Sequence, residues 1–278
     1  MNPEEILDDE ISSATVIADN IIKWFIEYKG NDYDLYLNKF RENYYGMGII
    51  EYTCNYLSGY NGKISKIEYA GKLYDLIKKD TDSSVRFSAQ IFNRKVSVAT
   101  ISYSSMVRDA IINNMDKIKQ VYIMESGPAF EGLSLYDNLS SHGIKTIITT
   151  DYSYYEIGKS ADILLLGSDL VTVNGDLVHK NGTFPLALTM NYFNKPVYSL
   201  TTSEKISNNF NEVDFHRIKN HTKIKGFINR FFDYTYGTLI TGYIYEYGFI
   251  RPMMVLLIII TVMKVLSPGV RFMRIMQG

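Results

Sequence analysis

The sequence predicts an α/β protein in which an N-terminal helical domain is followed by a Rossmann-like domain with a parallel sheet. Over residues 1–95, apolar residues recur at the spacing of one helix face. From Val96 onward, short apolar runs alternate with helical segments of about ten residues, as in βαβ units whose strands are buried on both faces. We therefore expect a helical domain at 1–95, an α/β domain at 96–252 and an apolar C-terminal segment at 253–278.

The helical domain is predicted from its periodicity. Apolar side chains from Ile17 to Tyr28 fall on one helix face, and Ser12 or Ser13 can cap that helix. The turn signal Asn61-Gly62 separates the later segments. Further helices are predicted at residues 49–57, 67–77 and 85–92.

The α/β domain is predicted from its apolar runs. Strands are expected at residues 96–101, 120–124, 145–149, 163–166 and 197–200, with helices between them. Asn174-Gly175 lies between two short apolar runs and predicts a hairpin with a type I′ turn, in which both central residues have positive φ. Ligands of open α/β sheets bind at the carboxyl ends of the strands, so the residues after each strand are the candidates for function.

Composition excludes several classes of function. The chain of 278 residues has 29 basic and 30 acidic side chains, so its bulk charge does not indicate a DNA partner. The single cysteine, Cys54, cannot form an intramolecular disulfide, which fits a cytoplasmic protein. The four histidines lack metal-ligand spacing, and no dinucleotide fingerprint follows a strand. We expect no metal and no other cofactor.

Three serines follow the first predicted strand, and they open the next helix. Ser102, Ser104 and Ser105 place hydroxyls beside the free N–H groups of a helix N-terminus, an arrangement that suits a phosphate. Alternatively, one serine is an ordinary N-cap and the others lie on the surface. The sequence leaves both interpretations open.

Charged and amide side chains follow the other strands. Glu125 and Glu131 come after the second strand, and Asp169, Asn174 and Lys180 surround the predicted hairpin. A carboxylate at this edge can act as an acid or a base, and a lysine can hold a phosphate. A structural ion pair is the alternative. We expect Asp169, Lys180 and Asn174 to converge with the first serine on one pocket.

Several motifs resemble one known family. Glu125-Ser126-x-Pro128-x-x-Glu131-Gly132 resembles the signature ESRPxxEG of the initiation factor 2B alpha/beta/delta proteins and of two related isomerases. Those isomerases act on methylthioribose-1-phosphate and ribose-1,5-bisphosphate. Further matches, in the family's order and spacing, run from Val96 to about Pro252: Gly167-Ser168-Asp169, Asn174-Gly175-Asp176, Lys180-x-Gly182-Thr183, Pro196-Val197-Tyr198, Phe232-Asp233-x-Thr235, Leu239-Ile240-Thr241 and Glu246-x-Gly248.

The departures from this family bear on mechanism. The resemblance implies that the isomerases pair a cysteine after the first strand with the aspartate that matches Asp169. Here Ser102 stands nearest that cysteine, and a serine hydroxyl titrates far above neutrality. Gly127 stands where the family signature has an arginine, and His179 stands where an asparagine is usual. The RGA stretch, which in the isomerases contributes to binding the substrate phosphate, is not recognisable near the N-terminus. The resemblance therefore implies a non-enzymatic protein that binds initiation factor 2, a phosphosugar or a nucleotide. An isomerase, with Asp169 catalytic, is the alternative.

The C-terminal segment contains an apolar run from Met253 to Met263, which is shorter than the ~20 residues of a transmembrane helix. It also carries basic residues and no acidic ones, so it could lie on an anionic membrane surface. The alternative is a subunit interface, and the family resemblance favours it. We expect a homodimer.

Overall fold

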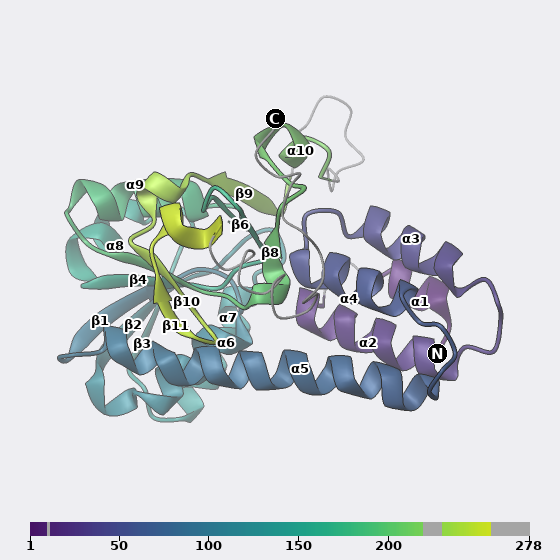
Figure 1. The fold of residues 1–278 in the computed structure, drawn as a ribbon. Coiled ribbons are helices and arrows are strands. Elements are labelled where there is room, and N and C mark those ends of the chain that lie inside the picture. The colour runs from purple at the N-terminus through teal and green to yellow at the C-terminus, as the bar shows by residue number, and fades with distance from the viewer. Residues whose placement is uncertain (10–11, 219–229, 257–278) are drawn as a thin grey trace.

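The computed structural model describes residues 1–9, 12–218 and 230–256. Within this part of the chain, helices precede the central sheet. They are α1 (Pro3–Leu7), α2 (Ala14–Glu27), α3 (Tyr33–Asn43), α4 (Gly48–Ser58) and α5 (Lys66–Phe87). Figure 1 shows α1–α4 clustered at one end of the molecule, whereas α5 runs from this cluster along the sheet.

The helical cluster is held together by the apolar faces that the periodicity predicts. Trp24, Phe25 and Phe40 are fully buried in its core, and the Trp24 and Phe40 rings pack edge to face. Ser13 caps α2, since its hydroxyl accepts from the Val16 N–H. The helix predicted at residues 85–92 is not separate: α5 continues to Phe87, and a 3₁₀ turn, η1 (Ser88–Ile91), follows it.

The central sheet is mostly parallel, which confirms the predicted α/β class. Its order is β11-β10-β7-β4-β1-β2-β3, and only β11 runs antiparallel to its neighbour. The strands are β1 (Val96–Thr100), β2 (Ile118–Met124), β3 (Thr146–Thr149), β4 (Ile163–Leu166), β7 (Val197–Leu200), β10 (Gly242–Tyr245) and β11 (Gly248–Ile250). The helices between them are α6 (Ser105–Asn113), α7 (Glu131–Ser141), α8 (Tyr154–Ser160) and α9 (Thr183–Tyr192).

The strand order reverses direction at β1. The chain moves outward through β2 and β3 on one side and then returns to β4 on the other side of β1. A crevice forms at such a switch point, outside the carboxyl ends of the two central strands. The segments that follow β1 and β4 therefore face a common space.

A second, smaller sheet adjoins this edge, in the order β8-β5-β6-β9. Its strands are β5 (Leu170–Thr172), β6 (Leu177–Lys180), β8 (Ile206–Ser207) and β9 (Phe232–Thr235). The short helices near it are η3 (Ser203–Lys205) and α10 (Glu212–Phe215).

The predicted hairpin joins β5 to β6, but its turn is not of type I′. Gly175 has φ +81° and its N–H donates to the Thr172 carbonyl at 2.9 Å, whereas Asn174 is not among the residues with positive φ. The hairpin loop is longer than two residues, so glycine alone supplies the left-handed conformation.

Of the predicted apolar C-terminal segment, only Met253–Leu256 belongs to the described residues. The 3₁₀ turn η5 (Pro252–Met254) leads into it, and Val255 is buried whereas Met253 is exposed. The remainder, 257–278, lies outside the described residues. No helix in the described ranges is long and apolar enough to cross a membrane.

Candidate ligand-binding site

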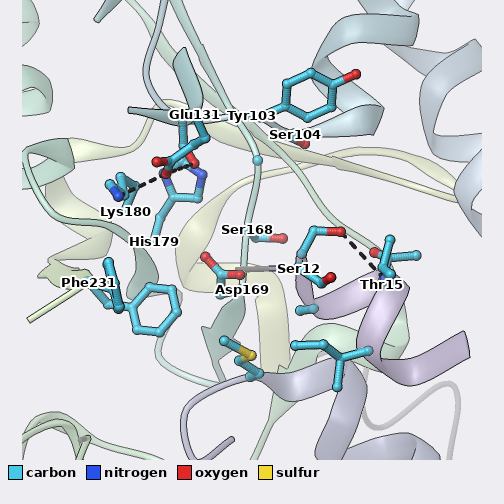
Figure 2. Close-up of a pocket in the computed structure, with 18 of the residues that line it drawn as sticks. Ser12, Thr15, Tyr103, Ser104, Glu131, Ser168, Asp169, His179, Lys180 and Phe231 are labelled. Atoms are coloured by element: carbon cyan, nitrogen blue, oxygen red, sulfur yellow. Dashed lines mark hydrogen bonds and ion pairs between the residues drawn. The ribbon is translucent and has the colours of Figure 1, made fainter. Parts of the chain in front are cut away.

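A cavity of about 530 Å³ lies between the helical cluster and the carboxyl edge of the central sheet. Its walls include the start of α2, the α3–α4 loop, the β1–α6 loop, the start of α7, the segment after β4, the end of β6, η3 and the start of β9. Figure 2 shows Asp169, Lys180, Glu131 and His179 in this cavity, with Ser12 and Thr15 of the helical cluster facing them. A volume of this size is typical of a small-molecule site.

Asp169 is positioned by backbone contacts from both parts of the protein. Its N–H donates to the Val178 carbonyl of β6 at 3.1 Å, and its carbonyl accepts from the Gly48 N–H at the start of α4 at 2.8 Å. A Cβ at Gly48 would lie 2.6 Å from the Lys205 carbonyl, so only glycine permits this approach. The helical cluster therefore helps to hold the backbone of Asp169, the candidate acid or base, in place.

Lys180, Glu131 and Ser102 form a connected polar group. Lys180 Nζ lies 2.8 Å from Glu131 Oε1, and the Ser102 hydroxyl donates to the same oxygen at 2.8 Å. Lys180 is buried, so this ion pair is less screened than a surface pair. Both the lysine and the serine hydroxyl are thus bound to one carboxylate.

The backbone of Ser102 has an unusual conformation for a non-glycine residue, with φ +70°. Its N–H donates to the Ser126 hydroxyl at 2.7 Å, and that hydroxyl donates to the Met124 carbonyl at 2.9 Å. Asp151 accepts from the N–H groups of Ser126 and Gly127. These bonds tie the loops after β1, β2 and β3 together and hold Ser102 against Glu131.

Asp169, Lys205 and His179, which line the cavity, have shifted pKa values. Burial raises the pKa of Asp169 to about 6, although Lys205 and Lys180 oppose this shift. Burial likewise lowers the pKa of Lys205, whose Nζ donates to the Ser168 carbonyl at 2.9 Å. Burial, followed by the two lysines, lowers the pKa of His179 to about 3, so its imidazole is neutral near pH 7.

The structure brings most of the predicted site residues together. Six of them line the cavity: Ser102, Ser104, Ser105, Glu131, Asp169 and Lys180. Ser104 also serves as the N-cap of α6, since its hydroxyl accepts from the Val107 N–H, which confirms the capping alternative for this serine. Phosphate binding by the serines stays a prediction.

Two of the predicted residues, Glu125 and Asn174, do not line this cavity. Asn174 is exposed in the turn of the hairpin, beyond the end of β5. The N–H of Glu125 donates to the Thr149 carbonyl, and the chain turns at Ser126, which has φ +67°. Asn174 is therefore not among the residues that line the pocket on which it was expected to converge.

The sequence analysis missed several groups of lining residues, among them Lys205, the start of α2 and the α3–α4 loop. Lys205 lies in η3, which follows β7, so the rule applied to the other strands would have found it. Ser12 and Ser13 were considered only as helix caps, but the start of α2 faces the cavity. Cys54 is buried, and burial raises the pKa of its thiol to about 12, as expected for a core residue.

The cavity supplies cations, hydroxyls and one carboxylate with a raised pKa. Among the described residues, no group of three or more His, Cys, Asp or Glu side chains could hold a metal ion. Lys180 and Lys205 suit an anion, and the serines and carboxylates suit sugar hydroxyls.

The fold and this site define an α/β protein with a polar cavity at the switch point of its sheet. The chain belongs to the initiation factor 2 subunit family, whose model matches residues 47–252. It is 31% identical over 196 residues to a Pyrococcus abyssi protein named translation initiation factor eIF-2B subunit 2-like. The aligned region covers 68% of this chain and 69% of that relative. The resemblance inferred from the motifs is thereby confirmed.

Isomerases of the same family are similarly close. The chain is 29% identical over 225 residues to the methylthioribose-1-phosphate isomerase of Trichoplax adhaerens, covering 68% of this chain and 62% of that enzyme. The crystal structure of the Pyrococcus horikoshii translation initiation factor eIF-2B superposes with a TM-score of 0.80 at 22% identity, covering 90% of this chain and 95% of that one. This likeness supports the fold, but the sequence identities do not separate a factor from an isomerase.

Proposed function

We propose that this protein acts by binding rather than by catalysis, as an initiation factor 2B-like protein of the alpha/beta/delta type. In this proposal the cavity takes a phosphosugar or a nucleotide, and the protein regulates translation initiation through initiation factor 2 in the cytoplasm. The buried cations Lys180 and Lys205 support the choice of a phosphorylated ligand. The relative named eIF-2B subunit 2-like supports the class of partner.

The state of Ser102 is the observation that carries this proposal. Moving hydrogen between adjacent carbons of a sugar requires two groups that exchange protons near neutral pH. Asp169, with its pKa near 6, is one such group. The Ser102 hydroxyl instead donates to Glu131, which is already paired with Lys180, and a paired carboxylate is a weak base for a serine. His179, with its pKa near 3, is also too weakly basic to serve.

An aldose–ketose isomerase is the competing function, and one specific observation favours it. Asp169 is buried in the cavity with a raised pKa, which is the usual condition of a catalytic acid or base. The test is turnover of ribose-1,5-bisphosphate and methylthioribose-1-phosphate by the wild type, Ser102→Cys and Asp169→Asn.

We expect negligible turnover by the wild type. Substantial wild-type turnover that Asp169→Asn abolishes would assign the chain to the isomerases. Activity gained by Ser102→Cys alone would show that the replaced thiol was the decisive loss. Binding is measured separately, by calorimetry with each sugar phosphate and by co-purification with initiation factor 2. If the protein binds none of them, the binding proposal is wrong.

A further inference from the structure

The segments that lead into the strands of the central sheet carry an excess of positive charge. β3, β2, β1, β4 and β7 are parallel neighbours, so all of them begin at the amino edge, opposite the cavity. The segments at that edge are 93–95, 114–119, 142–145, 159–162 and 193–196. They hold two carboxylates, Asp116 and Asp162, and seven cations, which we call the basic edge: Arg94, Lys95, Lys117, Lys119, Lys145, Lys159 and Lys195. The whole chain has a net charge of -1, so this excess is local.

Asp162 and Asp116 pair with three cations of the basic edge. Arg94 Nη2 and Lys119 Nζ lie 3.2 Å and 4.0 Å from the Asp162 carboxylate oxygens. Lys117 Nζ lies 3.7 Å from the carboxylate of the adjacent Asp116. The Arg94 side chain is still 63% exposed, and ion pairs this exposed contribute only about 0–1 kcal/mol. The two carboxylates therefore leave most of the positive charge available to a partner.

The other four cations form no ion pair within the part of the chain that the structure describes. Lys195 Nζ donates to the carbonyl of Lys159, which lies in the last turn of α8, where a cation stabilises the helix dipole. Lys159 Nζ also lies 5.7 Å from the centre of the Tyr155 ring. Lys95 and Lys145 are exposed and have neither role. No interaction among the described residues therefore accounts for Lys95 and Lys145.

The shape of the basic edge suits a chain of phosphates. Neighbouring strands lie ~4.8 Å apart, so five strands spread the cations over roughly 19 Å. A row of this length can follow a polyanion, whereas a single small anion binds in a concave site. Tyr155 is 60% exposed beside Lys159, and its ring offers a face on which a base can stack. The exposed amides of Asn93 and Asn194 can bond to bases or to ribose 2′-hydroxyls.

We propose that the basic edge binds single-stranded RNA through its phosphate backbone, with Tyr155 stacking on a base. Contacts to the backbone carry no sequence information, so the binding is independent of sequence. An anionic membrane fits the edge less well, because Met115 is the only large apolar side chain exposed in these described segments. The edge lies opposite the cavity, so this inference goes beyond the proposed function and is independent of the ligand of the cavity.

The assay is fluorescence anisotropy with a labelled single-stranded RNA of about 12 nucleotides, titrated at several salt concentrations. If about five cations each neutralise one phosphate, the logarithm of the association constant falls with the logarithm of the salt concentration at a slope of about −3.5. The double variant Lys95→Gln/Lys145→Gln should bind about 10-fold more weakly in about 0.1 M salt, with the slope reduced by about 1.4. Lys23→Gln/Lys29→Gln is the matched control, since both lysines are exposed in or just after α2, and it should bind like the wild type.

A third variant separates stacking from charge. Tyr155→Ala should weaken RNA binding but leave the salt slope unchanged, because stacking releases no counterions. An affinity unchanged by Tyr155→Ala would overturn the assignment to a single strand. Urea denaturation of each variant checks that a loss of binding is not a loss of the fold.

The remaining outcomes decide the class of partner. A wild-type protein that does not bind the RNA in about 0.05 M salt would overturn the proposal, and so would a control variant that loses as much affinity as Lys95→Gln/Lys145→Gln. Equal or tighter binding to single-stranded DNA of the same sequence, to polyglutamate or to phosphatidylserine vesicles would assign the basic edge to that partner and exclude RNA. None of these results bears on sugar-phosphate binding in the cavity, so the proposed function is tested separately.

Discussion

Glu204 carries a carboxyl group whose ionisation opposes folding. It lies in η3, is 4% exposed, and its Oε2 has no hydrogen-bond partner among the described residues. Burial raises its pKa from 4.5 to about 8, and the nearby carboxylates of Glu246 and Asp80 add to this shift. The adjacent Lys205 lines the cavity, whereas Glu204 is not among the lining residues.

The sign of the pH effect follows from this raised pKa. The contribution of Glu204 to stability is fully present below its unfolded pKa of about 4.5 and is lost as the pH rises through the folded value of about 8. At ~1.4 kcal/mol per pKa unit, ionisation of Glu204 above pH 8 lowers the free energy of unfolding by at most about 5 kcal/mol. Because Glu246 and Asp80 share the burial, we expect about 1–3 kcal/mol for Glu204 alone.

The perturbation is Glu204→Gln, which keeps the shape of the side chain and removes its charge. Urea denaturation at pH 5, 7 and 9 gives the free energy of unfolding of the variant and of the wild type. The variant should gain about 1–3 kcal/mol relative to the wild type between pH 5 and pH 9. Glu156→Gln, on the exposed face of α8, is the control and should show no such gain. Parallel pH profiles for Glu204→Gln and the wild type would refute the reasoning.

Three further predictions concern packing, ligand binding and assembly. Gly132→Ala places a Cβ 1.9 Å from the carbonyl oxygen at the end of β2, so it should lower the free energy of unfolding by about 1–3 kcal/mol. Gly71→Ala has open space around it in α5, so it should raise the free energy of unfolding by about 0.5–1 kcal/mol. If urea denaturation gives the same change for both variants, this reasoning is contradicted. Lys205→Met should weaken phosphate binding, measured by calorimetry, by about 10-fold, and Lys78→Met, at an exposed position, is the control. If Lys205→Met binds phosphate as tightly as the wild type, Lys205 is not part of the site. Light scattering at micromolar concentration should give a homodimer, since large side chains such as Tyr192 are exposed, and a stable monomer would disprove it.

The sequence by itself determined the fold class and most of the site. Helical periodicity and apolar runs are local signals, because each reports which face of one element is buried. The rule that parallel strands present their carboxyl ends to one edge then placed Ser102, Glu131, Asp169 and Lys180 on a common cavity. Each of these residues lies within a few positions of a strand end, so little tertiary information was needed.

The tertiary structure alone decided how those residues behave. The hairpin leaves Asn174 exposed and outside the cavity. The helical cluster brings Ser12 to the cavity, because packing between segments distant in sequence decides which of them share its walls. The neutral state of His179 likewise depends on burial and on two lysines from separate elements. Desolvation and charge–charge interactions act through space, so neither the neutral state of His179 nor the pKa of Asp169 is written in local sequence.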